Sequence, residues 1–150
     1  MIQRIQTLFL LEIAFLSVSL MFIPIQFIIS DGVHSAVNLM PISNALFHST
    51  LGHYAAIALN ILVFLIAIIT IFLFKKRDLQ IKLCNVIVIL NVILVSMFAF
   101  CPFVTLNDNL AVKDGIFGYF ILIIGAISAF VAARYVKKDI ELLKSSDRIR

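Results

Sequence analysis

The chain has 150 residues, of which 63% are hydrophobic and 13% charged, and its formal net charge is +4. Charged residues make up about a quarter of an ordinary soluble domain, so this composition, with a mean hydropathy of +1.14, excludes a water-soluble fold. Apolar segments take up most of the length, which leaves no room for a separate soluble enzyme domain. We therefore expect residues 1–150 to form a single integral membrane domain.

Residues 8–29 form the first apolar segment, which contains Glu12 and, near its far end, Pro24. The segment is longer than the apolar core of a signal peptide and lacks a small-residue cleavage site, so we expect it to be retained as a membrane helix. Residues 30–53 follow and contain no Lys or Arg. A loop without basic residues is typical of the outer side of a membrane.

Three more segments, residues 54–74, 83–101 and 116–136, are each long and apolar enough to cross a bilayer as a helix. In this arrangement eleven of the twelve basic residues flank the spans on one side, and Lys113 alone falls on the other. Basic residues accumulate on the cytoplasmic side of a membrane. The sequence thus predicts an all-α, four-transmembrane-helix bundle with both termini in the cytoplasm and a cytoplasmic tail at 137–150.

The fourth span carries small residues at helical spacing, which are Gly118, Gly125, Ala129 and Ala133. Small residues let another helix approach closely. We expect Gly125, Ala129 and Ala133 to face the first span, with a homodimer or an outside partner as the alternatives.

Beyond that span, Val136, Ile140 and Leu143 lie at helical spacing, so the fourth helix is expected to extend into the cytoplasm. An apolar stripe on such an extension would dock a partner. The alternative is a solvated basic tail attracted to anionic lipid.

The outer loops contain short apolar runs that are typical of strands. Residues 103–106 and 110–113 flank an Asn/Asp turn, and residues 33–40 precede Pro41. Together they predict a small exoplasmic β cap.

Polar residues inside the spans are expected to join helices. Glu12 is the acidic residue of the first span, and we expect it to form an ion pair with Arg134 at the inner end of the fourth. A proton or cation site and simple snorkelling of the side chain to the interface are the alternatives. Asn60, Asn85 and Asn91 are expected to form interhelical hydrogen bonds, with a substrate site as the alternative.

The histidines and cysteines do not predict a metal or redox site. His34, His48 and His53 fall on the outer side, and the five-residue spacing of the last two is poor for metal ligation, so we expect interfacial histidines. Cys84 and Cys101 lie near opposite ends of one predicted helix, about 25 Å apart at 1.5 Å per residue, and are interpreted as small apolar side chains.

Both ends of the chain resemble a known family. Met1–Thr7 has the sequence MIQRIQT and Lys138–Arg150 the sequence KDIELLKSSDRIR, which are similar to the termini of a bacterial domain-of-unknown-function family of small four-span membrane proteins. The resemblance implies a multi-pass protein of the bacterial inner (cytoplasmic) membrane. It brings no established activity, ligand or catalytic residue.

No nucleophile arrangement, glycine-rich phosphate loop or pair of carboxylates is visible, so we expect no catalytic residues and no cofactor. The positive-inside bias accounts for the basic residues without nucleic acid. The first function hypothesis is a non-enzymatic subunit or assembly factor of a larger membrane complex, which contacts lipid and other membrane proteins. The alternative is a small proton-coupled transporter using Glu12, because small multidrug exporters also carry an acidic residue in the first of four spans.

Overall fold

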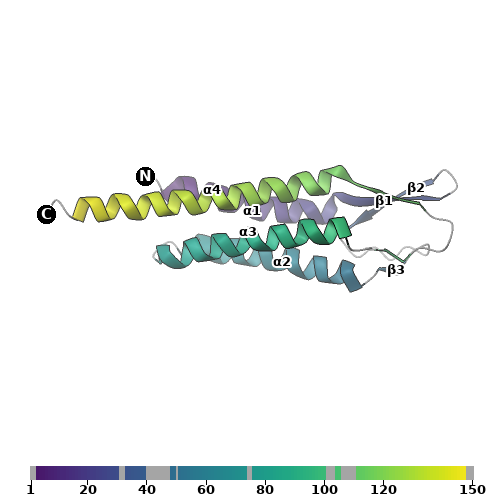
Figure 1. Ribbon diagram of the computed structural model, residues 1–150, viewed down its shortest axis with the longest axis horizontal. Helices are drawn as coiled ribbons and strands as arrows, with labels where there is room; N and C mark the ends of the chain where they lie inside the picture. Colours follow the sequence, from purple (N-terminus) through teal and green to yellow (C-terminus); the bar gives the residue numbers. More distant parts are fainter. Residues whose placement is uncertain are drawn as a thin grey trace.

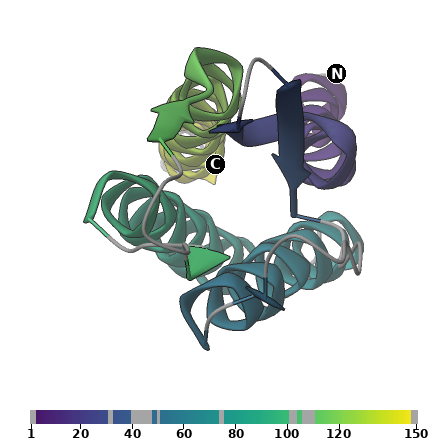
Figure 2. The ribbon, with the colours of Figure 1, turned by 90° about the vertical axis from the view of Figure 1, so that its right-hand side faces the viewer.

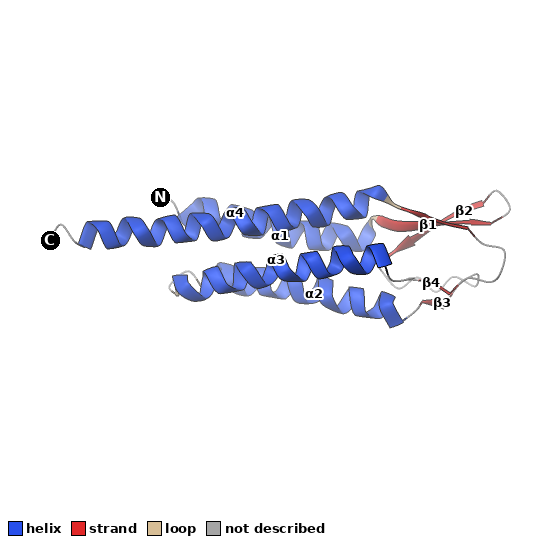
Figure 3. Cartoon of the chain, viewed as in Figure 1, coloured by secondary structure: helices blue, strands red, loops and turns tan. Residues whose placement is uncertain are grey.

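The computed structural model describes residues 3–30, 33–39, 48–49, 51–73, 76–100, 104–105 and 111–147. Four long helices run side by side, namely α1 (Gln3–Phe22), α2 (Leu51–Phe72), α3 (Arg77–Phe100) and α4 (Ile116–Asp147) (Figure 1). Short strands lie at one end of the bundle, namely β1 (Pro24–Ser30), β2 (Val33–Asn38), β3 (His48–Ser49), β4 (Val104–Thr105) and β5 (Ala111–Asp114) (Figure 3). Helix α1 begins and α4 ends at the opposite end.

All four helices are long and apolar enough to cross a membrane, over Ile5–Phe22, Leu51–Phe72, Arg77–Phe100 and Ile116–Leu142. A helix satisfies its backbone N–H and C=O groups internally, which a chain in hydrocarbon requires. The chain is therefore a multi-pass membrane protein built as an all-α four-helix bundle.

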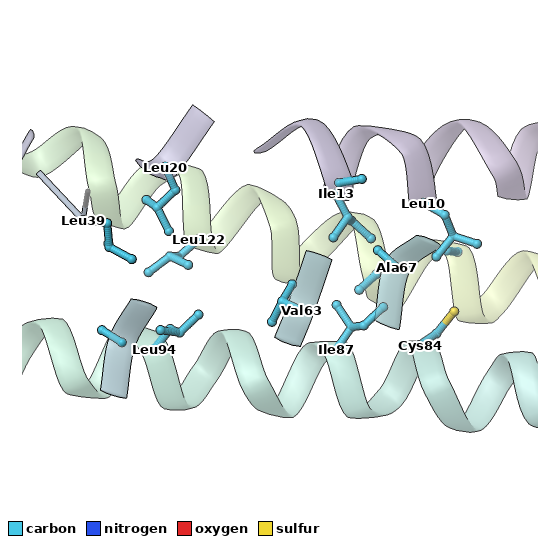
Figure 4. Close-up of a cluster of buried hydrophobic side chains, with 14 of the residues drawn as sticks. Leu10, Ile13, Leu20, Leu39, Val63, Ala67, Cys84, Ile87, Leu94 and Leu122 are labelled. Carbon is cyan, nitrogen blue, oxygen red and sulfur yellow. The ribbon is translucent and has the colours of Figure 1, made fainter. Parts of the chain in front are cut away.

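The helices form a ring in which each one packs against two neighbours. Seen end-on, α4 lies between α1 and α3, and α2 closes the ring on the other side of the same two helices (Figure 2). All four contribute buried apolar side chains to the centre, as Leu10 and Ile13 of α1, Val63 of α2, Ile87 of α3 and Leu122 of α4 illustrate (Figure 4). The core is thus shared evenly around the ring.

Polarity is distributed in the manner of a membrane bundle. Several polar side chains are buried between the helices, namely Gln6, Ser17, His53, Asn60, Thr70, Gln80, Asn91 and Ser128. The outward faces are apolar, with Leu8, Phe15 and Phe72 exposed by 65%, 68% and 73%. Apolar surface over all four helices would associate in water, and lipid covers it without cost.

The first helix ends earlier than expected. The prediction of one helix over 8–29 is wrong at its far end, because α1 stops at Phe22 and Pro24–Ser30 forms β1. Pro24 has no N–H to donate and its ring would clash with the preceding helical turn. As the first residue of a strand the proline is tolerated, and the isoleucines that follow it favour extended backbone. The helix gains length at its other end by starting at Gln3.

The strands pair differently from the expected cap. β1 is the central strand of a three-stranded antiparallel sheet in the order β2-β1-β5, while β3 pairs with β4. The two runs expected around the Asn/Asp turn therefore contribute to different sheets, β4 to one and β5 to the other. Because Pro24–Ser30 is a strand and not part of the first helix, both of its edges can form backbone hydrogen bonds. β2 pairs with one edge and β5 with the other. Residues 106–110, which include the expected turn, lie outside the described residues.

Gly115 joins β5 to α4 at a very close contact. Its N–H donates a 2.6 Å hydrogen bond to the carbonyl of Ile25. A Cβ at this position would lie 2.7 Å from the carbonyl oxygen of Pro24 and 2.8 Å from that of Ile25. Only glycine fits this approach without a shift of the backbone.

Helix α4 is much longer than a membrane span requires. Its 32 residues extend about 48 Å at 1.5 Å per residue, against a hydrocarbon layer of about 30 Å. It runs past the start of α3 as one unbroken helix to Asp147 (Figure 1). Its last turns therefore project from the bundle.

Candidate functional site

One polar residue from each of three helices, and a glycine from the fourth, meet in the middle of the bundle. Ser17 of α1, Asn60 of α2, Asn91 of α3 and Gly125 of α4 border a cavity of about 10 Å³. Such a volume holds about one water molecule. A Cβ on Gly125 would lie 3.5 Å from Oδ1 of Asn91, which is an ordinary van der Waals contact.

The three predicted asparagines have three different environments. Asn60 donates from Nδ2 to the carbonyl of Ser17 at 2.9 Å and so joins α2 to α1. Asn91 donates to the carbonyl of Ile87 in its own helix at 3.0 Å, so the interhelical bond expected of it is not formed in the described part of the chain. Asn85 is exposed on the surface of α3. The spacing of the asparagines in the sequence does not predict which of them bonds to another helix, which bonds to its own helix and which is exposed.

The small-residue stripe of α4 is buried, but its glycines face α3. A Cβ on Gly118 would lie 3.5 Å from the ring of Phe98, and the nearest atoms to a Cβ on Gly125 belong to Asn91. Ala129 and Ala133 are buried where α4 lies between α1 and α3. The expectation that the stripe faces the first helix is therefore wrong for Gly125. Because α4 has a neighbour on either side, the sequence pattern could not select between them.

The expected ion pair between Glu12 and Arg134 is absent from the described residues. Arg134 is exposed, and its guanidinium lies over the ring of Phe130, 4.6 Å from the ring centroid. The adjacent Tyr135 faces α1 instead, with its ring stacked on Phe9 at 5.8 Å. Successive helical residues point about 100° apart, so the contact of Tyr135 with α1 turns Arg134 away from Glu12.

An ion pair that sequence reasoning missed joins α3 to α4. Nη1 of Arg77 lies 2.8 Å from Oδ2 of Asp139, and the two side chains are exposed by only 22% and 14%. At this distance the two opposite charges attract each other directly across the helix contact. In the sequence, Arg77 counts only among the eleven basic residues on one side of the spans, and the signal for its partner is the acidic Asp139 directly after Lys137 and Lys138.

Beside this ion pair, an open groove of about 610 Å³ runs between α3 and α4. Its lining residues are Asp78, Ile81, Asn85, Phe130, Ala133, Arg134, Lys137, Ile140 and Glu141. We call it the α3–α4 groove. It combines two carboxylates, two cations and apolar side chains at the end of the bundle where α1 begins.

The predicted docking stripe is only partly available. Val136 is fully buried, so its assignment to a docking face is wrong. The side chain of Val136 faces the interior of the bundle, so it packs against the other helices and is not available to a partner. Ile140 is half-buried in the α3–α4 groove, and the side chain of Leu143 lies outside the description. Leu142, which the sequence did not single out, is exposed by 46%.

The histidine and cysteine positions suggest no catalytic centre. His53, expected at an interface, is buried to 3% exposure, and its ring meets that of Tyr54 edge-on at 6.1 Å. The structure describes neither the side chains of His34 and His48 nor Cys101, while Cys84 is buried with a free thiol. Over the described residues, no three or more His, Cys, Asp or Glu side chains gather closely enough to hold a metal ion.

The comparison with protein families decides the identity of the chain. A family model described as a domain of unknown function, DUF4293, matches residues 2–149. The chain belongs to this family. The match covers all but the first and last residue of the two ends on which the resemblance rested, and the four helices agree with the four spans that the resemblance implied. No curated protein and no solved structure matches the chain.

Proposed function

We propose that this member of the DUF4293 family is a non-enzymatic small subunit or assembly factor of a larger complex in the bacterial inner membrane. The projection of α4 carries this proposal. At 32 residues the helix continues beyond the level of the Arg77–Asp139 pair, and there it presents the exposed side chain of Leu142. An exposed apolar side chain on a projecting helix is suited to bind a protein partner, because helix-in-groove complexes insert such side chains into a groove of the partner.

The proposed orientation places both chain ends in the cytoplasm. The end of the bundle where α1 begins and α4 ends carries Lys76, Arg77 and Lys82 on α3 and its approach, and Lys137 and Lys138 on α4. Basic residues at one end support a cytoplasmic assignment for that end. The strands would then face the periplasm or the cell exterior.

Capture of the partner tests the subunit role. After in-cell crosslinking, the tagged chain is purified in mild detergent from its native host, and a membrane protein should be recovered in a reproducible ratio. Leu142→Ala should reduce that recovery. Leu62→Ala is the matched control, because Leu62 is similarly exposed, by 43% against 46%, but lies in the middle of the α2 span, whereas Leu142 is the last residue of the α4 span. Repeated recovery of the chain alone would contradict the proposal.

The positions of the charges favour this role over a proton-coupled transporter. Glu12 borders neither the central cavity nor the α3–α4 groove, and the polar groups around the central cavity are uncharged. A transport residue needs access to its substrate from within the membrane. Proton-linked cation flux by the purified chain in vesicles, abolished by Glu12→Gln, would reverse this preference.

A further inference from the structure

The charges of the α3–α4 groove differ from those of the neighbouring ion pair. Arg77 and Asp139 neutralise each other at 2.8 Å. Within the described residues, none of the four charged side chains that line the groove has an opposite charge within 4 Å; these are Asp78, Arg134, Lys137 and Glu141. The two helices thus close one ion pair and leave two carboxylates and two cations that line the groove without an opposite charge at contact distance, the Arg134 guanidinium resting on the ring of Phe130.

These groups are ordered along the membrane normal. On α4, Glu141, Lys137 and Arg134 follow one another toward the membrane centre, about 10 Å from first to last at 1.5 Å per residue. Helix α3 runs in the opposite direction with Arg77 level with Asp139, so Asp78 lies within about 1.5 Å of the level of Lys137 and Asn85 lies about 10 Å deeper. From water toward the membrane centre, the groove therefore presents Glu141 first, Asp78 and Lys137 at nearly one level, then Arg134, and the amide of Asn85 last.

The deep end of the groove is apolar apart from that amide. Phe130 is 48% exposed, with the Arg134 guanidinium over its ring, and Ala133 is small and buried. Asn85 is exposed at this depth and forms no hydrogen bond with the other described residues. An amide that faces hydrocarbon without a partner is unfavourable by an amount comparable to a lost hydrogen bond. A ligand oxygen at this depth would satisfy it.

We propose that the α3–α4 groove binds one glycerophospholipid whose headgroup carries a primary ammonium, as in phosphatidylethanolamine. The ammonium meets Asp78 and Glu141, the phosphate meets Lys137 and Arg134, and an ester carbonyl accepts a hydrogen bond from Asn85. The acyl chains run over Phe130 toward the membrane centre. This order of groups is the order in which an aminophospholipid presents them from water to hydrocarbon.

The charge balance selects this lipid among the common bilayer lipids. Two cations and two carboxylates give the groove no net charge, so an anionic headgroup would bring its phosphate to the cations and leave the carboxylates without a cation. A choline headgroup has no N–H to donate, and the aromatic cage that recognises quaternary ammonium is replaced here by carboxylates. The site requires only that the four helices span a bilayer and does not depend on the proposed subunit role.

Lipid titration of the delipidated protein in detergent micelles tests the selectivity of the wild-type chain. Dioleoyl phosphatidylethanolamine, phosphatidylcholine and phosphatidylglycerol are added separately, and the apparent Kd is taken from the rise in melting temperature and from native mass spectrometry. We expect the Kd for phosphatidylethanolamine to be about fivefold lower than for the other two, which is ~1 kcal/mol, as for one charged contact near a membrane surface. Equal Kd values, or the lowest Kd for phosphatidylglycerol, would overturn the proposal.

A charge-removing variant tests the placement of the headgroup. Asp78→Asn combined with Glu141→Gln leaves the groove with two cations, so the preference should change to phosphatidylglycerol by about fivefold. Lys138→Gln is the matched control, because Lys138 is an exposed cation of the same helix outside the groove and its loss should leave the order of the three lipids unchanged. An unchanged preference in the double variant, or the same change in the control, would place the headgroup elsewhere.

Discussion

The side-chain amide of Asn60 in α2 donates a 2.9 Å hydrogen bond to the backbone carbonyl of Ser17 in α1. Both residues border the central cavity, at a depth where the surrounding side chains are mostly aliphatic. The bond joins two helices that have no strong hydrophobic drive to associate in lipid, where the solvent is as apolar as their surfaces. It therefore fixes the relative position of α1 and α2.

Replacing Asn60 by leucine should remove this bond and lower the free energy of unfolding by about 1 kcal/mol, the usual value for interhelical hydrogen bonds in membranes. The measurement is reversible unfolding in mixed micelles without added lipid. Asn85→Leu is the control, because Asn85 is exposed and joins no helices. Equal losses in the two variants would mean that the amide of Asn60 contributes nothing as a link between helices.

The four-helix architecture was predictable because the membrane imposes it. A run of apolar residues long enough to cross the hydrocarbon must form a helix, so composition and length alone indicate the spans. Boundaries were less predictable. Pro24 lies inside a continuous apolar run, and hydropathy does not distinguish the end of α1 from the beginning of β1, since Ile25 to Ile29 are as apolar in a strand as in a helix.

The sequence predicts that buried polar side chains have hydrogen-bond partners, but it does not predict which residues those partners are. A buried asparagine needs a hydrogen-bond partner, but whether it finds one on another helix, as Asn60 does, or on its own, as Asn91 does, depends on how each helix is rotated about its axis. The same rotation turns Tyr135 rather than Arg134 toward α1. The ion pair was predicted for Arg134, but the neighbouring Tyr135 is the residue that contacts α1. Sequence periodicity does not determine the rotation of a helix about its axis to within one residue.

The Arg77–Asp139 ion pair should show energetic coupling. Arg77→Asp and Asp139→Arg should each destabilise the bundle, and the double variant should recover about 1 kcal/mol, because the pair is only partly exposed and adjacent charges are non-additive. A double-mutant cycle in detergent measures the coupling. The Glu12→Arg and Arg134→Glu cycle serves as the comparison and should be additive. Coupling in the second cycle and none in the first would contradict the structure.

Gly115 should not tolerate a side chain. Gly115→Ala should lower the free energy of unfolding by about 2 kcal/mol, because the new Cβ would lie 2.7 Å and 2.8 Å from two backbone oxygens that cannot move independently. Thermal melting in detergent measures the loss.

Gly118→Ala provides the control for Gly115→Ala. Its Cβ would lie 3.5 Å from the Phe98 ring, an ordinary contact, and alanine favours helix over glycine by about 1 kcal/mol. This variant should therefore match or exceed the wild-type melting temperature. A stable Gly115→Ala protein would mean that β5 and β1 do not approach as closely as described.

Packing along α4 distinguishes an internal stripe from an oligomer interface. Ala129 is fully buried, so Ala129→Ile should cost about 2 to 3 kcal/mol through overpacking. Ala126 is only half-buried in the same helix, and Ala126→Ile should cost much less. Melting temperature and oligomer size are measured together. An unchanged melting temperature with loss of an oligomer in Ala129→Ile would show that the stripe serves a second copy.

The proposed orientation predicts which end of the bundle is accessible from outside the cell. Ser35 lies in β2 at the strand end, and Ser146 lies in the last turn of α4 at the opposite end. In a background with Cys84→Ala and Cys101→Ala, Ser35→Cys should react with a membrane-impermeant maleimide on intact cells, while Ser146→Cys should react only after the membrane is permeabilised. The reason is the excess of Lys and Arg at the Ser146 end of the bundle, because segments rich in basic residues stay on the cytoplasmic side of the membrane. The reverse labelling pattern would place both chain ends outside and would remove the cytoplasmic projection of α4 on which the proposed function rests.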